Sequence, residues 1–345
     1  MSYLPDKITD EEQLEEILSE PWEETIEMFS RIEGDILILG IAGKIGPSLA
    51  LTALKACRIA GVKKRIIGVS RFHNPAEKGK LEKLGIETVS GDLLDSQFLG
   101  RLPKTENVFF LAGMKFGSND NLPLTWAVNS YMPAMVAEAF KESRIVAYST
   151  GCVYPFVPVV TGGSVETDDP APNGEYAQSC LGRERMFEYC STKNNTRIAM
   201  IRLNYAVELR YGVLSDIAMK VKNGFPVDLS MGYFNVIWQG DANNMVLRSL
   251  EYTGIPPEIF NITGRETLTV RQTALEFGKL FGKDVNFTGN EAPTALLSNS
   301  GKAIRLLGSP LVTPEKIIPL TASWIRMGNR MLDKPTHFEV RDGKY

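Results

Sequence analysis

The sequence predicts an α/β protein in which a doubly wound parallel sheet carries a smaller C-terminal lobe. From residue 35 onward, short apolar segments alternate with longer helical ones, the pattern of strands covered by helices on both faces. After about residue 204 glycine and proline make the rhythm irregular. The expected strands are 36–39, 65–70, 88–90, 108–111, 145–149 and 197–203, and the expected helices between them are 47–60, 75–84, 125–142 and 176–191.

The same reading divides the chain. Residues 1–33 form an acidic extension with one or two short helices from about residue 10, broken at Pro21, that packs on the body or contacts another subunit. Residues 34–203 form the dinucleotide-binding domain, to which 232–264 returns. Residues 204–231 and 265–330 form the substrate lobe, with helices at 270–281 and 314–327, and the polar tail 331–345 wraps the surface.

Composition excludes several partner classes. The 345 residues are 43% hydrophobic with a formal net charge of −3, so neither nucleic acid nor a membrane is an expected partner. No apolar run approaches the roughly 18 residues of a spanning helix, and the acidic start lacks a signal-peptide core. Four cysteines without a C-x-x-C pair and only two histidines predict free thiols, no metal site and a cytoplasmic protein.

A glycine-rich turn carries the main functional prediction. Gly40, Gly43 and Gly46 follow an apolar strand and open a helix. In that context they allow a tight turn, close approach of the backbone to a pyrophosphate, and close packing of helix on strand. The turn therefore predicts a Rossmann-type dinucleotide site, whose contacts are Gly40, Ala42, Gly43, Lys44, Ile45 and Gly46.

The end of the second strand bears on the choice of cofactor. An NAD site usually places an acid there for the ribose hydroxyls, whereas an NADP site often places an arginine for the 2′-phosphate. Here Ser70 is followed by Arg71. We therefore expect NADP in preference to NAD, with Ser70 and Arg71 as contacts.

Further motifs resemble a known family. In order they are Gly91-Asp92-Leu-Leu-Asp95, Leu111-Ala-Gly113, Ser149-Thr150-Gly-Cys-Val153-Tyr154 and Tyr176-Ala-Gln-Ser179, and then segments 223–226, 238–241, 260–264 and 302–308. Their order and spacing from about residue 35 to 330 resemble the extended short-chain dehydrogenases/reductases, the NAD(P)-dependent sugar epimerase and dehydratase group.

The resemblance implies roles for individual residues. Tyr176 takes the place of the catalytic tyrosine, which exchanges the proton of a substrate hydroxyl, and Thr150 that of the catalytic Ser/Thr. Asp92 is expected to bind the adenine. The other cofactor contacts that we expect are Leu93, Leu111, Ala112, Gly113, Lys115, Asn129 and Tyr176. The family also implies a homodimer formed through helices 125–142 and 176–191.

The chain departs from the family motif Tyr-x-x-x-Lys, because Cys180 stands at the lysine position. Three readings follow. In the first, another cation replaces the lysine. Arg183 lies three residues after Cys180, on a neighbouring face of the helix, and Lys115 or the charge of the cofactor ring is a further source. Alternatively Tyr176 serves only as a proton donor or orienting group beside a different base. In the third reading the chain binds NAD(P) without turnover, as a sensor or scaffold. Cys180 itself is a candidate catalytic residue.

A second departure concerns the substrate. Nucleotide-sugar enzymes of this group usually carry an arginine about seven residues before the aspartate matched here by Asp241, where this chain has Phe234 and Asn235. The resemblance thus implies an NAD(P)-dependent oxidoreductase or epimerase acting on a carbinol of a sugar, sugar acid or related carbohydrate, with a nucleotide-sugar enzyme as alternative. Candidate substrate contacts are Thr150, Cys152, Asn204, Glu208, Arg210, Tyr211 and Trp238.

Overall fold

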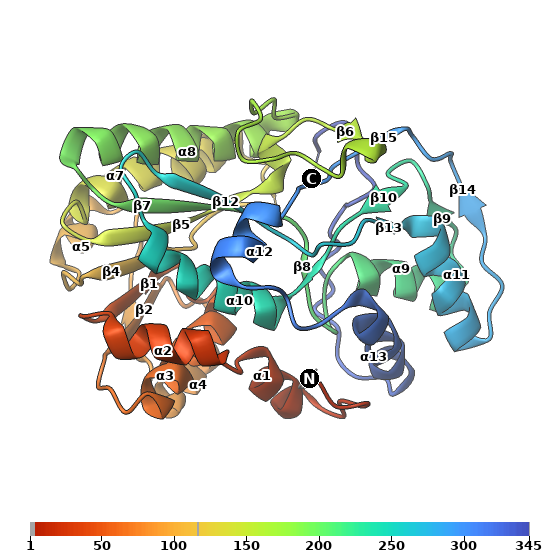
Figure 1. The fold of residues 1–345 in the computed structure, drawn as a ribbon, viewed down its shortest axis with the longest axis horizontal. Coiled ribbons are helices and arrows are strands. Elements are labelled where there is room, and N and C mark those ends of the chain that lie inside the picture. Colours follow the sequence, from red (N-terminus) through yellow and green to blue (C-terminus); the bar gives the residue numbers. More distant parts are fainter. Residues whose placement is uncertain (1–3, 116, 345) are drawn as a thin grey trace.

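A seven-stranded parallel sheet forms the centre of the computed structural model, which describes residues 4–115 and 117–344 (Figure 1). The strand order is β12-β7-β5-β4-β1-β2-β3, and each neighbouring pair is parallel. The strands are β1 (Ile36–Leu39), β2 (Ile66–Ser70), β3 (Glu87–Ser90), β4 (Asn107–Phe110), β5 (Arg144–Thr150), β7 (Ile198–Leu203) and β12 (Glu258–Ile262). The predicted α/β fold class is confirmed. The chain order reverses between β1 and β4, where such sheets bind ligands.

Two apolar cores cover the two faces of this sheet. All four residues of β1 are buried, and they alternate, because Ile36 and Ile38 belong to one core and Leu37 and Leu39 to the other. The first core is completed by α2 (Glu23–Arg31), α3 (Gly46–Ile59), α4 (Pro75–Leu84), α10 (Gln239–Arg248) and α12 (Gly301–Leu307). The second is completed by α5 (Ser96–Arg101), α7 (Met132–Ala139) and α8 (Gly174–Asn194).

A third core lies outside the sheet. It joins α9 (Val213–Lys222), α11 (Val270–Phe281) and α13 (Pro314–Arg326), and we call these helices with their connecting segments the small lobe. Figure 1 shows the small lobe beside the carboxyl ends of the sheet strands. Short strands also lie outside the seven-stranded sheet, in the small lobe or in segments that join it to the sheet domain. They are β6 (Val157–Pro158), β8 (Ala206–Val207), β9 (Val227–Asp228), β10 (Tyr233–Phe234), β11 (Ile237–Trp238), β13 (Leu268–Thr269), β14 (Phe287–Thr288) and β15 (Thr294–Ala295).

Several predicted bounds differ from those observed. The expected helix 125–142 is instead α6 (Leu122–Trp126), a π-helical turn (Ala127–Tyr131) and α7. Pro133, which has no N–H to donate into the preceding turn, follows this irregularity. Helix α9 was missed in a stretch expected to be irregular, although Leu214, Ile217, Ala218 and Val221 carry the helical period. The seventh strand, β12, was also missed.

Both chain ends join the sheet domain to the small lobe. Leu14 and Leu18 of α1 (Glu11–Leu18) enter the small-lobe core, whereas Phe29 of α2 enters a sheet core. Phe338, in the tail expected to be polar and superficial, is buried in the small-lobe core. In the described part of the chain, no helix has the length and apolarity to cross a membrane.

Candidate active site

The turn between β1 and α3 has the shape that a dinucleotide requires. Gly40 has φ +93°, and a Cβ there would lie 2.6 Å from the backbone nitrogen of Ala112. A Cβ on Gly46 would lie 2.1 Å from the carbonyl oxygen of Ile41. Gly43 is exposed, and its Cβ would approach only the Gly40 carbonyl, at 3.2 Å. No side chain caps the start of α3, and uncapped N–H groups at a helix start are suited to bind phosphate. The residues present fit the pyrophosphate of NAD(P).

The other residues predicted to bind the cofactor follow the ends of neighbouring strands. Ser70 is half-buried at the end of β2, and Arg71 is exposed beside it. Asp92 is exposed and accepts the Leu94 N–H at 2.9 Å, while Leu93 is buried beneath it. Leu111 and Ala112 are half-buried and Gly113 is exposed, directly after β4.

Asn129 braces the loop after β4. Its Oδ1 accepts the Met114 N–H at 2.8 Å, and its Nδ2 donates to the Met114 carbonyl at 2.9 Å and to the Ser179 hydroxyl at 3.0 Å. The π-helical turn directs this side chain inward, since Asn129 is its one buried residue. The structure therefore places Asn129 behind the cleft, as a support of the loop that bears Gly113.

Tyr176 and Thr150 are brought together, as their order in the chain predicted. Thr150 ends β5, Tyr176 lies in the first turn of α8, and their side chains are hydrogen-bonded. Thr150 Oγ1 also accepts the Cys152 N–H at 3.1 Å, which orients the hydroxyl. Burial raises the pKa of Tyr176 well above its usual value, the nearby Cys180 and Cys152 raise it further, and Arg183 lowers it. The phenol is therefore a proton donor unless positive charge stabilises its phenolate.

Arg183 supplies such a charge from about two turns further along α8. It is 6% exposed, and its Nη1 donates to the Tyr148 carbonyl at 2.8 Å, its Nη2 to Asn129 Oδ1 at 2.9 Å and its Nε to the Asn129 carbonyl at 3.3 Å. A Cβ on Gly113 would lie 2.7 Å from Nη2. The guanidinium thus reaches the floor of the cleft at Gly113.

Cys180 is packed rather than presented to a ligand. It is 1% exposed and clusters with Val153 and Tyr154. Burial raises the pKa of its thiol to about 11, although Arg183 opposes the shift. A neutral thiol in this position is not an activated nucleophile, so the prediction of Cys180 as a catalytic group is not supported by its surroundings.

The candidate substrate residues separate into two groups. Cys152 packs in an apolar cluster with Tyr176, Ala177 and Met231, and the side chain of Asn204 lies against Gly151 and donates to Asn235 Oδ1 at 2.9 Å. Cys152 and Asn204 therefore lie beside Thr150 and Tyr176. Trp238 is completely buried in the small-lobe core, so its ring lines no pocket and the prediction for it was wrong.

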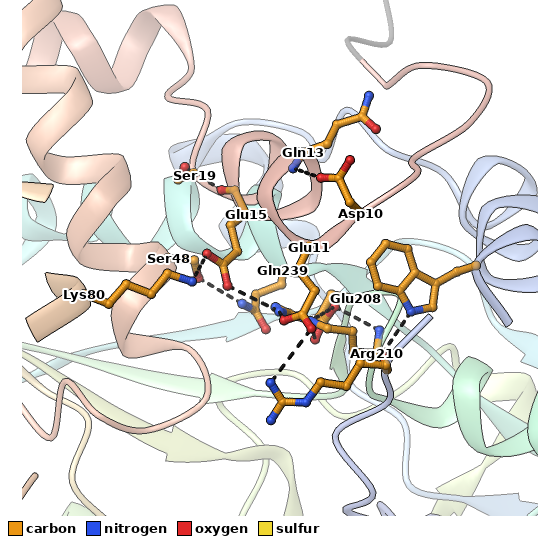
Figure 2. A network of polar contacts seen from close by, with 12 residues as sticks. Asp10, Glu11, Gln13, Glu15, Ser19, Ser48, Lys80, Glu208, Arg210 and Gln239 are labelled. Carbon is orange, nitrogen blue, oxygen red and sulfur yellow. Dashed lines mark hydrogen bonds and ion pairs between the residues drawn. The ribbon is translucent and has the colours of Figure 1, made fainter. Parts of the chain in front are cut away.

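Arg210 was also misplaced by sequence reasoning. Its guanidinium lies against Glu208, at 3.1 Å, and against Glu11 and Glu15 of α1, at 3.0 and 3.4 Å (Figure 2). Glu15 also pairs with Lys80 of α4. With three carboxylates around it, Arg210 joins the N-terminal extension to the small lobe instead of facing a substrate.

Lys44 extends from the glycine-rich turn toward the small lobe. Its Nζ lies 2.8 Å from the centre of the Tyr211 ring. Burial lowers the pKa of Lys44 to about 7, and the carboxylate of Glu208 opposes that shift. Tyr211 is thereby covered by a cation from the cofactor turn. Glycine spacing alone could not show that Lys44 points inward.

Fold and site together define an α/β protein of the dinucleotide-binding type, in which a tyrosine and a threonine are hydrogen-bonded at the edge of the sheet. A family model described as "NAD dependent epimerase/dehydratase family" matches residues 36–224, more than half of the chain. The chain belongs to this family, which confirms the predicted resemblance. No curated protein sequence matches.

Solved structures share the fold. A UDP-glucuronic acid 4-epimerase from Bacillus cereus, in complex with UDP-glucuronic acid and NAD, is 19% identical with TM-score 0.69, over 85% of this chain and 99% of that one. A UDP-glucose 4-epimerase from Thermotoga maritima, with UDP-glucose, is 20% identical with TM-score 0.68 over the same shares. An epimerase from Methanothermobacter thermautotrophicus is 22% identical with TM-score 0.71, over 89% and 96%.

Proposed function

We propose that the chain is an NAD(P)-dependent oxidoreductase or epimerase acting on a carbinol of a sugar, sugar acid or related carbohydrate. The observation that carries this proposal is the Tyr176–Thr150 hydrogen bond, with the Arg183 guanidinium about two turns further along α8 and beside Gly113. Bound NAD(P) supplies hydride acceptance and return. Because Arg183 lowers the pKa of Tyr176, we infer that this arginine performs the work of the missing lysine.

Side chains of the protein carry out the proton transfer and hold the substrate. Tyr176 takes the proton of the substrate hydroxyl when the carbon is oxidised and returns it when the carbon is reduced. Thr150 holds the substrate oxygen and stabilises its developing charge. Cys152 and Asn204 border the substrate beside them.

We further propose NADP as the preferred cofactor, on the basis of Ser70 and Arg71 at the end of β2. The B. cereus neighbour holds NAD, so both cofactors need to be compared. Calorimetric titration of NADP⁺ and NAD⁺ measures the preference. An Arg71→Ala variant is expected to lose affinity for NADP⁺ alone, and Arg101→Ala, at an exposed position in α5, is the matched control.

A homodimer is proposed from the exposed apolar surface of α6, its π-helical turn and α8. Trp126, Tyr131 and Tyr189 are 38%, 62% and 61% exposed there. Light scattering after gel filtration measures the mass. Tyr131→Asp is expected to give monomers, whereas an unchanged mass would contradict a dimer through this surface. A cytoplasmic location is likewise proposed, from the composition and the four free cysteines.

Turnover is tested with a panel of sugars, sugar acids and nucleotide-sugars in the presence of NADP⁺ or NAD⁺. Reduced cofactor is followed by absorbance and products by mass spectrometry and NMR, because an epimerase cycle leaves no net reduced cofactor. Tyr176→Phe is expected to abolish turnover while cofactor still binds, and Arg185→Met, at an exposed position of the same helix, is expected to be neutral. Cofactor binding without turnover by the wild type across the panel would instead indicate a sensor or scaffold.

A further inference from the structure

The C-terminal tail, residues 331–344, contacts both the small lobe and the sheet domain. It starts beside the small lobe, where the Leu332 N–H donates to the Arg210 carbonyl at 3.1 Å. The Thr336 N–H and hydroxyl then donate to Asp216 Oδ2 of α9 at 2.8 and 2.6 Å. On its other side the Thr336 carbonyl accepts from Lys115 Nζ at 3.2 Å. Since Lys115 belongs to the loop after β4, one tail residue joins the small lobe to the cofactor cleft.

Beyond Thr336 the tail makes two further contacts with the small lobe, through Phe338 and Glu339. Phe338 is 1% exposed and packs on Phe234, with ring centres 6.2 Å apart. Glu339 forms an ion pair with Lys220 of α9 at 3.1 Å. Figure 1 marks the C-terminal end between the large sheet and the small lobe. These contacts give the segment one defined path.

The tail ends against the start of the helix that bears Tyr176. Asn173 Nδ2 donates to the Arg341 carbonyl at 2.9 Å. Gly343 and Gly174 meet backbone to backbone, because a Cβ on Gly174 would lie 2.2 Å from the Gly343 carbonyl oxygen. Both glycines have positive φ, +77° and +83°. The backbone of Arg341 is therefore held against the start of α8, two to three residues before Tyr176 in that helix.

The guanidinium of Arg341 lies on the apolar cluster that contains Tyr176. It stacks over the Phe156 ring at 4.4 Å, Nη1 donates to the Thr294 carbonyl at 2.8 Å and the Ser230 carbonyl at 3.3 Å, and Nη2 donates to Thr294 Oγ1 at 2.7 Å. Phe156, Met231 and Tyr176 belong to one cluster, and Met231 Sδ lies 3.5 Å from Nη1. Every one of these acceptors is neutral, although a guanidinium carries a full charge.

We propose that Arg341 is a specificity-determining residue that binds an anionic group, carboxylate or phosphate, of the carbohydrate substrate. The proposal rests on the proposed function of the same cleft. The neutral acceptors and the Phe156 ring fix the guanidinium plane, while its Nε edge, which takes part in none of these bonds, remains suited to a two-oxygen anion. The tail thus places a cation beside the apolar cluster that contains Tyr176, and Phe234 and Asn235 supply no charge of their own.

Binding to the cofactor-loaded, full-length protein tests this proposal without turnover. Calorimetry compares D-glucuronate and D-galacturonate, which carry a carboxylate, and UDP, which carries phosphates, with neutral D-glucose and D-galactose. At least one anionic probe is expected to bind about tenfold or more tightly than the neutral sugars. Tighter binding of the uronates would identify a carboxylate as the anionic group, and tighter binding of UDP would identify a phosphate. If no anionic probe binds more tightly than the neutral ones, the proposal is overturned.

Two sets of variants test whether Arg341 and the path of the tail cause the preference for anionic probes. Arg341→Met is expected to remove the preference and Arg341→Lys to retain part of it, whereas Arg330→Met, at a 70% exposed arginine that precedes the tail, is expected to leave it unchanged. Gly343→Ala, which would place a Cβ 2.7 Å from Asn173 backbone atoms, should weaken anion binding, and Gly328→Ala, at φ +73° in open space, should not. Equal anion affinity of wild type and Arg341→Met overturns the proposal. Failure of the wild type to bind NAD(P) would overturn the proposed function instead, and thermal unfolding checks that each variant is folded.

Discussion

Arg183 donates twice to Asn129, through Nη2 to the side-chain Oδ1 at 2.9 Å and through Nε to the main-chain carbonyl at 3.3 Å. Both residues are buried, and Asn129 in turn supports the loop that presents Gly113. A cation from α8 is thereby locked to the floor of the cofactor cleft. This relationship provides a physical route by which a family member lacking the lysine of its motif keeps positive charge near Tyr176.

Arg183→Met is expected to lower kcat by about a hundredfold or more, because the Tyr176 phenolate loses the stabilising charge of Arg183. Burial already raises the pKa of Tyr176 and Arg183 opposes that rise. The variant should therefore need a higher pH for oxidation of the carbinol, and its kcat/KM profile should move toward alkaline pH. Arg185→Met, at a surface pair on the same helix, is the control. Equal profiles for the two variants would contradict a role of Arg183 in catalysis.

Cys180→Lys is expected to reduce both activity and stability. The position is 1% exposed and already faces the charge of Arg183, so a second buried cation would have to lose its proton or displace its neighbour. Cys180→Ala should keep most activity, since the thiol with its pKa near 11 is neutral at physiological pH. Turnover and thermal melts measure both variants. A gain of activity in Cys180→Lys would show that Arg183 does not perform the role of the missing lysine.

The affinity for NAD(P) should fall as the pH rises above about 7. Lys44 has a pKa of about 7 in the free protein, and a pyrophosphate bound at its turn would raise that value. Binding then takes up a proton, so the dissociation constant is flat below pH about 7 and increases by up to about tenfold per pH unit above it. Fluorescence titrations across this range measure the slope. Lys44→Met should bind more weakly and lose the slope, and Lys78→Met, on the exposed side of α4, should keep it.

Glu184→Gln should destabilise the fold by about 3–5 kcal/mol, because it leaves the charge of Arg202 buried and unpaired. Arg202 and Glu184 are 2% and 0% exposed and lie 2.7 Å apart, and together they tie α8 to β7. Arg185→Ala breaks an exposed pair on the same helix and should cost less than about 1 kcal/mol. Urea unfolding gives both values. Similar losses in the two variants would show that the buried pair adds no more than the exposed one.

The local pattern of the sequence determined most of the sheet domain. Helices 75–84 and 270–281 were predicted with their observed bounds, because Asn74 and Thr269 cap their starts and glycines in left-handed conformation end them. The glycine turn and the pairing of Thr150 with Tyr176 were also predictable, since parallel strands bring their carboxyl ends to one edge of the sheet.

The tertiary structure alone decided which charges reach the cleft. Arg183 was one of several candidate cations in the sequence, and only its hydrogen bonds to Asn129 and Tyr148 show its position. Arg210 and Trp238 were predicted to line the substrate pocket. In the structure Arg210 pairs with the N-terminal helix, and Trp238 packs in the small-lobe core. Arg341 is far from Tyr176 in the chain and carries no local signal. Periodicity and turn chemistry act over a few residues, whereas the direction of a side chain is set by packing partners distant in the sequence.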